Sequence, residues 1–406
     1  MGFCRGPSGG TMTFMGATDD RLLVRGGQVW GHDGPADILI SDGSIVQVGG
    51  PFDEDVDVLD VSGQVVIPGL VEAHCHLDKT LFGGPWVPHS AGDALADRIA
   101  NDRDRRSELG IPSVERMVAL LERMVAFGTT HVRTHTDIDP EVGLRGVEAV
   151  NDAAARFADQ VSVQQVAFPQ HGLLSNPGTE QLLVEAVESG VDVVGGIDPA
   201  GMDGDPVRHL DVVFGIAERL GVSVDIHLHD GGSLGSWELE LIAERTRALS
   251  MAGRVAVSHA YAFGGMTDRQ QDAMAERLAV AGVAIVTSAV YDFPVPPVKK
   301  LRAAGVTVAC GHDGIRDLWG PYGSGDMLER AMHLAYRSTF RRDADIELAL
   351  EAATFGGARL LGIDAYGIAA GAPADLLIVD VASPAEAVVS HPSARTVINK
   401  GRLVGR

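Results

Sequence analysis

Two histidines separated by one residue are the first feature of this sequence that could carry chemistry. His74 and His76 flank Cys75 in "VEAHCHLDKT", directly after an apolar run and the turn residues Pro68 and Gly69. Side chains of a strand alternate between its two faces, so these imidazoles point the same way. Neighbouring imidazoles repel one another when protonated and gain most from a shared cation. The pair therefore predicts a metal site.

Other polar side chains stand where predicted strands end: His135, Gln170, His227, Asp230, His259 and Asp313. Taken singly, each is more typical of a packed or capping residue. Together with the histidine pair, His227 and Asp313 complete three nitrogen ligands and one carboxylate. Such a set suits Zn²⁺ or Fe²⁺ better than Ca²⁺ or Mg²⁺. A bound ion of this kind lowers the pKa of its water to about 7 and supplies hydroxide at neutral pH.

Three of these residues are the predicted catalytic groups. His259 lies beyond the ligand set and could take the proton of the attacking water, and we expect Asp313 to act in catalysis as well as in metal binding. Asp230, three residues after His227, could protonate a leaving nitrogen. In the alternative interpretation, Asp230 only caps a helix that follows the next two glycines.

Eight short apolar runs provide the elements that must position these groups. The predicted strands are Val65–Val71, Thr130–Thr134, Val161–Ala167, Val191–Gly195, Val222–Ile226, Val255–Ser258, Val283–Thr287 and Val306–Ala309. Nearly continuous apolar strands that alternate with helices indicate a parallel sheet buried on both faces. We therefore predict an α/β fold, a (β/α)8 TIM-like barrel over residues 68–368, with its active site at the strand C-termini.

Two helical segments show clear signals. In "SVERMVALLERMVAFG", an apolar stripe follows the helical period from Val114 to Val125. In "MTDRQQDAMAERLAVAG", Thr267 is a typical helix cap and Gly282 a typical stop.

The two ends of the chain have a different pattern, with short alternating strands and frequent turn residues. Neither end has enough apolar surface to be stable alone, so we predict that residues 21–67 and 369–406 pair into one small β-sandwich domain. We interpret residues 1–20 as a flexible leader.

Composition excludes several classes of function. With 33 Lys+Arg against 55 Asp+Glu, the formal charge of -22 disfavours nucleic acid and anionic membrane surfaces as partners. There is no run of 18 or more apolar residues that could span a membrane. Only three cysteines occur, which fits a reducing compartment. We expect a cytoplasmic protein that acts on a small molecule and assembles as a homo-oligomer.

Several stretches together resemble the amidohydrolase superfamily in its cytosine deaminase-like branch. They are "VIPGLVEAHCHLDKTL", "VRTHTDID", "VAFPQHGLLS", "DIHLHDGG", "VAVSHAYAF", "CGHDGIRDLWGPYGSGDML" and "GAPADLLIVD". The resemblance implies a single Zn²⁺ or Fe²⁺ held by His74, His76, His227 and Asp313, with His259 activating the water. Binuclear relatives use a lysine after the fourth strand, and "DVVGGIDPA" has none.

The resemblance also implies substrate contacts. Gln170 stands where cytosine deaminases use a glutamine to bind the pyrimidine amide edge. Trp319 and Phe82 could stack on a flat heterocycle, although either could equally be core. Asp230 departs from cytosine deaminases, which have Glu there. This Asp and Lys79 look more like the N-isopropylammelide aminohydrolases of the branch, where Lys79 would polarise the ring oxygens; alternatively, Lys79 forms only a salt bridge to Asp137 or Asp139.

These features predict a metal-dependent aminohydrolase that hydrolyses a C–N bond of an N-heterocycle, such as an N-substituted aminotriazine or a related aminopyrimidine. A cytosine or isocytosine deaminase is the alternative within the same chemistry. A non-catalytic scaffold on this fold is the alternative of another class, and the complete ligand set argues against it.

Overall fold

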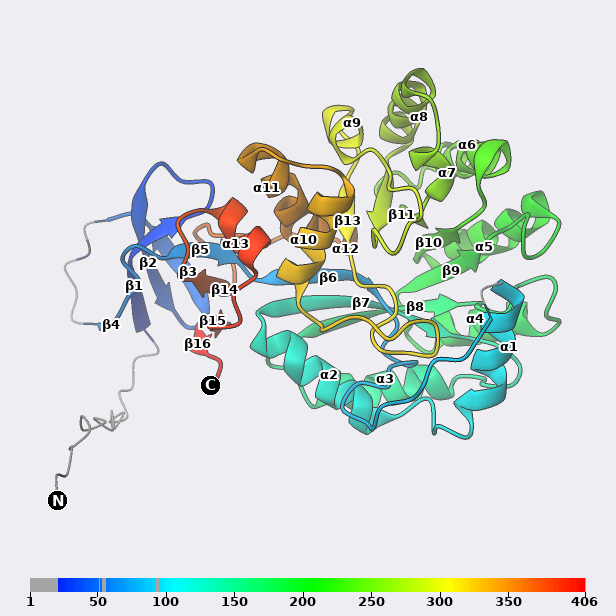
Figure 1. The fold of residues 1–406 in the computed structure, drawn as a ribbon, viewed down its shortest axis with the longest axis horizontal. Helices are drawn as coiled ribbons and strands as arrows, with labels where there is room; N and C mark the ends of the chain where they lie inside the picture. The colour runs from blue at the N-terminus through cyan, green and yellow to red at the C-terminus, as the bar shows by residue number, and fades with distance from the viewer. Residues whose placement is uncertain (1–20, 51, 53–55, 93–94, 406) are drawn as a thin grey trace.

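Eight parallel strands form a barrel in which the strand order follows the chain (Figure 1). The computed structural model describes residues 21–50, 52, 56–92 and 95–405, so the predicted leader lies outside the described residues. The barrel strands are β6 (Leu70–Cys75), β7 (Thr129–Asp137), β8 (Ser162–Phe168), β9 (Val193–Ile197), β10 (Ser223–Leu228), β11 (Val255–His259), β12 (Val283–Thr287) and β13 (Val308–Cys310). The predicted TIM-like barrel is confirmed.

The barrel closes at a seam between β6 and β13. Within the described part of the chain, one isolated bridge between Cys75 and Asp313 joins the two strands. The buried carboxylate of Glu72 spans the seam, accepting hydrogen bonds from the backbone N of His74 (3.1 Å) and from His312 through its backbone N (3.0 Å) and Nδ1 (2.5 Å). Side-chain hydrogen bonds therefore take the place of a regular ladder.

Helices surround the barrel (Figure 1). They are α1 (Leu95–Arg106), α2 (Val114–Ala126), α3 (Arg145–Ala155), α4 (Thr179–Glu188), α5 (Pro206–Leu220), α6 (Gly232–Ala248), α7 (Tyr261–Gly264), α8 (Asp268–Ala281), α9 (Val298–Ala303), α10 (Met327–Arg337), α11 (Asp343–Glu351), the π-helix η1 (Ala352–Gly356) and α12 (Gly357–Leu361). A further helix, α13 (Pro384–Ser390), comes from the C-terminal segment and packs against α10 and α11.

Both helical segments with clear sequence signals form as predicted. Helix α2 buries Met117, Leu121 and Val125 from the expected stripe. Helix α8 begins after Thr267 and ends before Gly282, whose φ of +69° is the left-handed conformation that glycine tolerates best.

Both chain ends share a second sheet, as predicted. Its strands are β1 (Arg21–Val29), β2 (Pro35–Ser41), β3 (Ser44–Val48), β4 (Asp57–Asp60), β5 (Val65–Pro68), β14 (Leu376–Val379), β15 (Arg395–Asn399) and β16 (Arg402–Leu403). The order is β16-β15-β14-β5-β1-β2-β3, with β4 beside β1, so β5 and β14 join the two ends. This mixed sheet encloses its own core: Val24, Val29, Ile38, Ile40, Ile45, Val61, Val66, Ile368, Ala374, Leu376, Ile378 and Ile398.

The first predicted barrel strand, Val65–Val71, was wrong as a single element. The chain breaks at Gly69, so that β5 pairs with β14 in the small sheet and β6 enters the barrel. A Cβ at Gly69 would lie 2.5 Å from Cγ2 of Thr130, which excludes a side chain at this crossing. Every residue of β5 and β6 is buried, so the hydrophobic pattern carried no sign of the break.

The small sheet lies against the barrel through specific contacts. The Arg395 guanidinium forms two hydrogen bonds to the Asp326 carboxylate, at 3.0 and 2.7 Å. Nε1 of Trp30 donates to Oε2 of Glu347 at 2.9 Å. No helix in the described ranges is both long and apolar enough to cross a membrane.

Candidate metal centre and active site

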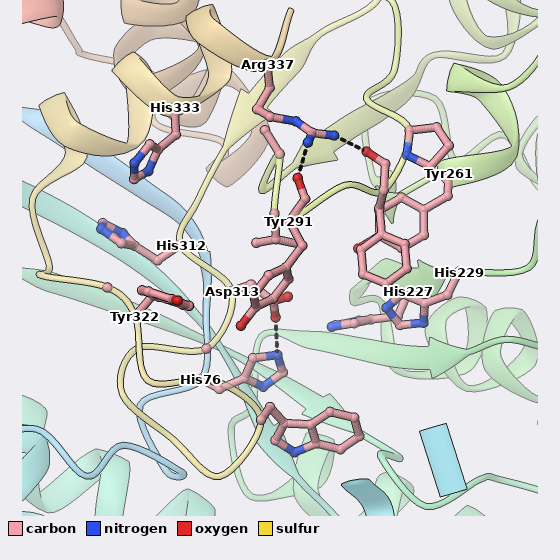
Figure 2. A pocket seen from close by; sticks show the side chains of 18 of the residues that line it. His76, His227, His229, Tyr261, Tyr291, His312, Asp313, Tyr322, His333 and Arg337 are labelled. Atoms are coloured by element: carbon pink, nitrogen blue, oxygen red, sulfur yellow. Dashed lines mark hydrogen bonds and ion pairs between the residues drawn. The ribbon is translucent and has the colours of Figure 1, made fainter. Parts of the chain in front are cut away.

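A cavity of about 990 Å³ opens at the C-terminal ends of the barrel strands (Figure 2). The predicted site residues that line it are His76, Lys79, Gln170, His227, Asp313 and Trp319. They come from strand ends that are far apart in the sequence. The barrel brings them together because all parallel strands end at the same rim.

The histidine pair faces one carboxylate. Nδ1 of His74 lies 2.9 Å from the Ser258 hydroxyl, and Nδ1 of His76 lies 3.0 Å from the backbone oxygen of His135. Each ring therefore turns its Nε2 inward, and these atoms lie 3.6 and 3.2 Å from Oδ1 of Asp313. The tautomer assigned from this geometry leaves Nε2 of both rings as a lone-pair donor.

His227 and His259 complete the group from β10 and β11. The ring of His227 stacks on Phe168 with centroids 4.0 Å apart, and its centroid lies 4.6 Å from that of His74. The His259 centroid lies 5.0 Å from both His74 and His227. His135 lies beside them, its ring 4.1 Å from His74.

The donor set fits a divalent metal ion. The ligand atoms of His74, His76 and Asp313 lie within 4.8 Å of one another, and so do those of His74, His227 and His259. Nε2 of His74, both ring nitrogens of His227 and Nε2 of His259 are buried without a hydrogen-bond partner among the described residues. Buried nitrogens of this kind are costly unless something binds them, and a metal ion is the partner that imidazoles favour.

The electrostatics favour the ligand form of His76, His227 and Asp313. Burial, and then Lys79, lowers the pKa of His76 to about 4. Burial and the neighbouring imidazoles hold the pKa of His227 and of His259 well below the ordinary value. Burial opposes ionisation of Asp313, but the neighbouring rings of His259, His74 and His76 hold its pKa well below its usual range. Neutral imidazoles beside an ionised carboxylate are what a metal binds.

A buried chain of hydrogen bonds lies behind His74. The Ser258 hydroxyl, next to His74, donates to Oδ1 of Asp225 at 2.7 Å. Oδ2 of Asp225 accepts from Nη1 of Arg133 at 3.0 Å. This arrangement orients the His74 ring, as outer partners of metal-binding histidines do.

Lys79 and Gln170 form the other side of the cavity. Nζ of Lys79 lies 2.9 Å from Oδ1 of Asp137 and 2.5 Å from Oε1 of Gln170. Burial opposes the charge on Lys79, but Asp137, Asp102 and Asp78 raise its pKa. Lys79 thus makes the alternative salt bridge to Asp137 and also lines the cavity.

The two residues predicted to stack on a substrate, Trp319 and Phe82, lie in different places. Trp319 lines the cavity, and its indole Nε1 is buried without a hydrogen-bond partner in the described part of the chain. Phe82 faces a different depression, where the Arg316 guanidinium lies 5.0 Å from its ring centroid, and it packs against a buried core cluster, so the core alternative holds for Phe82. Asp317 was missed: it lines the cavity, and burial raises its pKa to about 7.

Asp230 does not line the cavity. Its carboxylate accepts from the backbone N of Gly201 at 2.8 Å and lies beside Glu238. It holds the loop after β9, and the cap of α6 is Gly231 without a side-chain hydrogen bond. Both interpretations of Asp230 are therefore corrected: the side chain is neither in the cavity nor a helix cap.

His229 occupies the place that Asp230 was expected to fill, and the sequence reasoning missed it. It lines the cavity together with Asp198, and its Nδ1 lies 2.8 Å from Oδ2 of Asp198. Burial opposes protonation of His229, but Asp198 raises its pKa. The signal was present in the alternation of a strand, which puts residues 227 and 229 on one face and residue 230 on the other.

Comparisons with known proteins agree with this geometry. The family model described as "Amidohydrolase family" matches residues 112–404. N-isopropylammelide isopropyl amidohydrolase of Pseudomonas sp. (strain ADP) is 32% identical over 396 residues, which cover 95% of this chain and 97% of that protein.

Two solved structures share the whole fold. N-isopropylammelide isopropylaminohydrolase from Burkholderia multivorans superposes with a TM-score of 0.90 at 47% identity, covering 95% of this chain and 98% of that one. 5-Methylcytosine deaminase from Klebsiella pneumoniae, liganded with 5-fluorocytosine, has a TM-score of 0.82 at 27% identity, covering 95% and 97%. The resemblance predicted from the motifs is confirmed: this chain belongs to the amidohydrolase family and is a hydrolytic enzyme that cleaves C–N bonds.

Proposed function

We propose that this enzyme uses one divalent metal ion, Zn²⁺ or Fe²⁺, to remove an amine from an N-substituted aminotriazine such as N-isopropylammelide. The observation that carries the proposal is that His76, His227 and Asp313 line one cavity and the buried His74 lies directly behind them, with buried ring nitrogens that lack partners in the described residues. Three nitrogen donors and one carboxylate would hold either ion. When bound, such an ion would supply the Lewis acidity that makes water a nucleophile at neutral pH.

The side chains around the proposed centre would guide the protons. His259 has a neutral ring beside the donor set, so it can accept a proton from the attacking water, and Asp313 can share it. The water oxygen adds to the ring carbon that carries the amine. The C–N bond of the resulting tetrahedral intermediate then breaks, and the nitrogen needs a proton to leave.

His229 is our candidate for the donor of that proton. It lies in the cavity, its ring centroid 4.5 Å from that of His259, and its hydrogen bond to Asp198 favours the protonated form. This role replaces the one predicted for Asp230, whose carboxylate is held by the backbone of Gly201.

Lys79 and Gln170 would select the ring. Because Nζ of Lys79 donates to Oε1 of Gln170, the amide NH₂ of Gln170 remains free to donate. Both side chains then present donors, which match ring oxygens. An ammelide ring carries two oxygens and cytosine one, so this pair favours the triazine, with Trp319 available to stack on it.

A substrate panel tests the proposal. Protein stripped of metal with a chelator and resupplied with Zn²⁺ or Fe²⁺ is incubated with N-isopropylammelide, ammelide, cytosine and isocytosine, and amine or ammonia release is measured. We expect metal-dependent release of isopropylamine. Faster release of ammonia from cytosine or isocytosine would establish the pyrimidine alternative instead. A protein that binds no metal and hydrolyses none of the four would refute the proposed metal and substrate class.

A matched pair of variants tests the ring contacts. Gln170→Met keeps the size of the side chain and removes its donors, and we expect a loss of about 10- to 100-fold in kcat/KM. Gln181→Met, on the exposed face of α4, is the control. Equal activity of the two variants would refute the role of Gln170.

The homo-oligomer and the cytoplasmic location stay predictions.

A further inference from the structure

The cavity has more room than a single ring and a three-carbon amine require. Its volume of about 990 Å³ is at the upper end of the range of about 300–1,000 Å³ found for drug-sized ligands. A ring held between the proposed metal centre, Lys79 and Trp319 would fill only the inner end. The lining also includes aromatic residues beside His229, and we call the space along them the outer part of the cavity.

Aromatic side chains line this outer space. From the reacting end, the Tyr261 centroid lies 5.6 Å from that of His229, and the Phe293 ring stacks on Tyr261 with centroids 4.7 Å apart and planes at 10°. Both Tyr261, which Figure 2 labels, and Phe293 line the cavity, and Phe293 is 40% exposed. A large apolar side chain so exposed at a cavity mouth has surface available for a ligand.

The loop that carries Phe293 is held in place by the neighbouring helix α10. Arg337 donates to the backbone oxygens of Tyr291 and of Phe293, the second at 2.7 Å, as the dashed lines in Figure 2 show. Ala289 and Tyr291 have φ of +46° and +48°, a conformation that non-glycine residues adopt only when surrounding contacts hold it. The aromatic wall is therefore formed before any ligand binds, which lowers the cost of binding.

We propose that the leaving amine of the natural substrate carries an aromatic or large cyclic apolar group, which lies against Tyr261 and Phe293. This inference rests on the proposed function. One water is consumed: its oxygen bonds to the ring carbon, the C–N bond breaks, and one proton of the water ends on the nitrogen, which leaves as the free amine. The ring of Tyr261 lies 5.4 Å from that of His259 and 5.6 Å from that of His229, so a substituent on that nitrogen can extend along the aromatic wall.

The opposite lobe of the cavity is a poorer place for this group. Besides Tyr322, its lining includes His312, Glu329, Arg330 and His333, which are polar or charged. Glu329 and Arg330 are not compatible with an apolar substituent, because burying them against it would leave charges without water. A charged substituent would select this lobe instead, and the experiment separates the two cases.

The test compares N-isopropyl-, N-cyclohexyl-, N-benzyl- and N-(carboxymethyl)ammelide as substrates of the metal-loaded enzyme. We expect kcat/KM for the benzyl compound to exceed that for the isopropyl compound by about tenfold or more, the worth of one stacked aromatic contact and the added burial. Phe293→Ala should lower kcat/KM for the benzyl compound about tenfold and so remove its advantage. The same change should alter kcat/KM for the isopropyl compound by less than about threefold. Val280→Ala, on the exposed face of α8, is the control.

Each outcome decides the matter. Equal rates for benzyl and isopropyl compounds, a preference for the carboxymethyl compound, or equal losses of both rates in Phe293→Ala would overturn the inference and leave the proposed function standing. If no ammelide is hydrolysed, the proposed function fails and the inference fails with it. A misfolded Phe293→Ala protein is replaced by Phe293→Leu, for which the same loss of benzyl preference is expected.

Discussion

The Nδ1 atom of His74 lies 2.9 Å from the hydroxyl oxygen of Ser258, and that hydroxyl donates to Asp225. This relationship joins the proposed metal centre to a carboxylate inside the barrel. It fixes which ring nitrogen of His74 faces Asp313, because Ser258 occupies the other.

Removing this link should weaken metal binding. For Ser258→Ala we expect a loss of about 10- to 100-fold in Zn²⁺ affinity, the usual effect of deleting the outer partner of a metal-binding histidine. Competition with a chelator measures the dissociation constant independently of catalysis. Ser390→Ala, an exposed change at the end of α13, is the control. An affinity equal to that of the unchanged protein would show that Ser258 does not orient His74.

Separate substitutions of His229 and Asp230, the two neighbouring residues after β10, test which of them donates the proton to the leaving nitrogen. His229→Gln should lower kcat by about 10²–10⁴-fold, the typical contribution of a general acid, while metal content stays the same. Asp230→Asn should change kcat by less than about threefold, because its carboxylate faces Gly201 and not the cavity. If Asp230→Asn were the more damaging change, the assignment of His229 would be wrong.

Glu72 should stabilise the seam of the barrel. Its carboxylate accepts three hydrogen bonds from buried donors of His74 and His312. Glu72→Gln puts an NH₂ group where an acceptor is needed, so the metal-free protein should lose about 1–3 kcal/mol of unfolding free energy. Urea unfolding measures this loss against Glu276→Gln, an exposed change on α8. Equal midpoints for both variants would contradict the role of Glu72.

The ionised carboxylate of Asp203 should stabilise the folded protein, and this stabilisation should be lost in acid. Burial opposes its charge, but hydrogen bonds from His209, Leu174 and Ser175 hold its pKa well below the usual range. The folded pKa is thus lower than the unfolded value of about 3.9. The stabilisation is therefore complete above that pH and is lost as pH falls toward the folded pKa.

The measurement is urea unfolding of Asp203→Asn and the unchanged protein from pH 7 to pH 3. At pH 7 we expect the variant to be about 1–3 kcal/mol less stable, and this difference should shrink below about pH 4. Asp364→Asn, at an exposed position, is the control. A difference that stays constant across the range would indicate that the ionised Asp203 carboxylate is not the cause.

The sequence by itself determined the barrel and most of the residues at its rim. Alternation of apolar strands with helices predicts parallel strands, and parallel strands present their C-terminal residues to a common rim. His76, Gln170, His227 and Asp313 were therefore predictable as neighbours before any coordinates, and the family resemblance added Lys79. Local chemistry also determined the ends of α8, because Thr267 and Gly282 act on adjacent backbone groups.

Tertiary structure alone decided where strongly packed segments break and which way short loops turn. The run through Gly69 is buried on both sides of the break, so periodicity could not assign it to two sheets. The side chain of Asp230 is directed by Gly201, which lies 29 residues away in the sequence. Nothing in the local sequence distinguishes Ser258 and Asp225 from other strand residues, because their link to His74 exists only in the folded barrel. These features depend on contacts between distant segments, and no local pattern records such contacts.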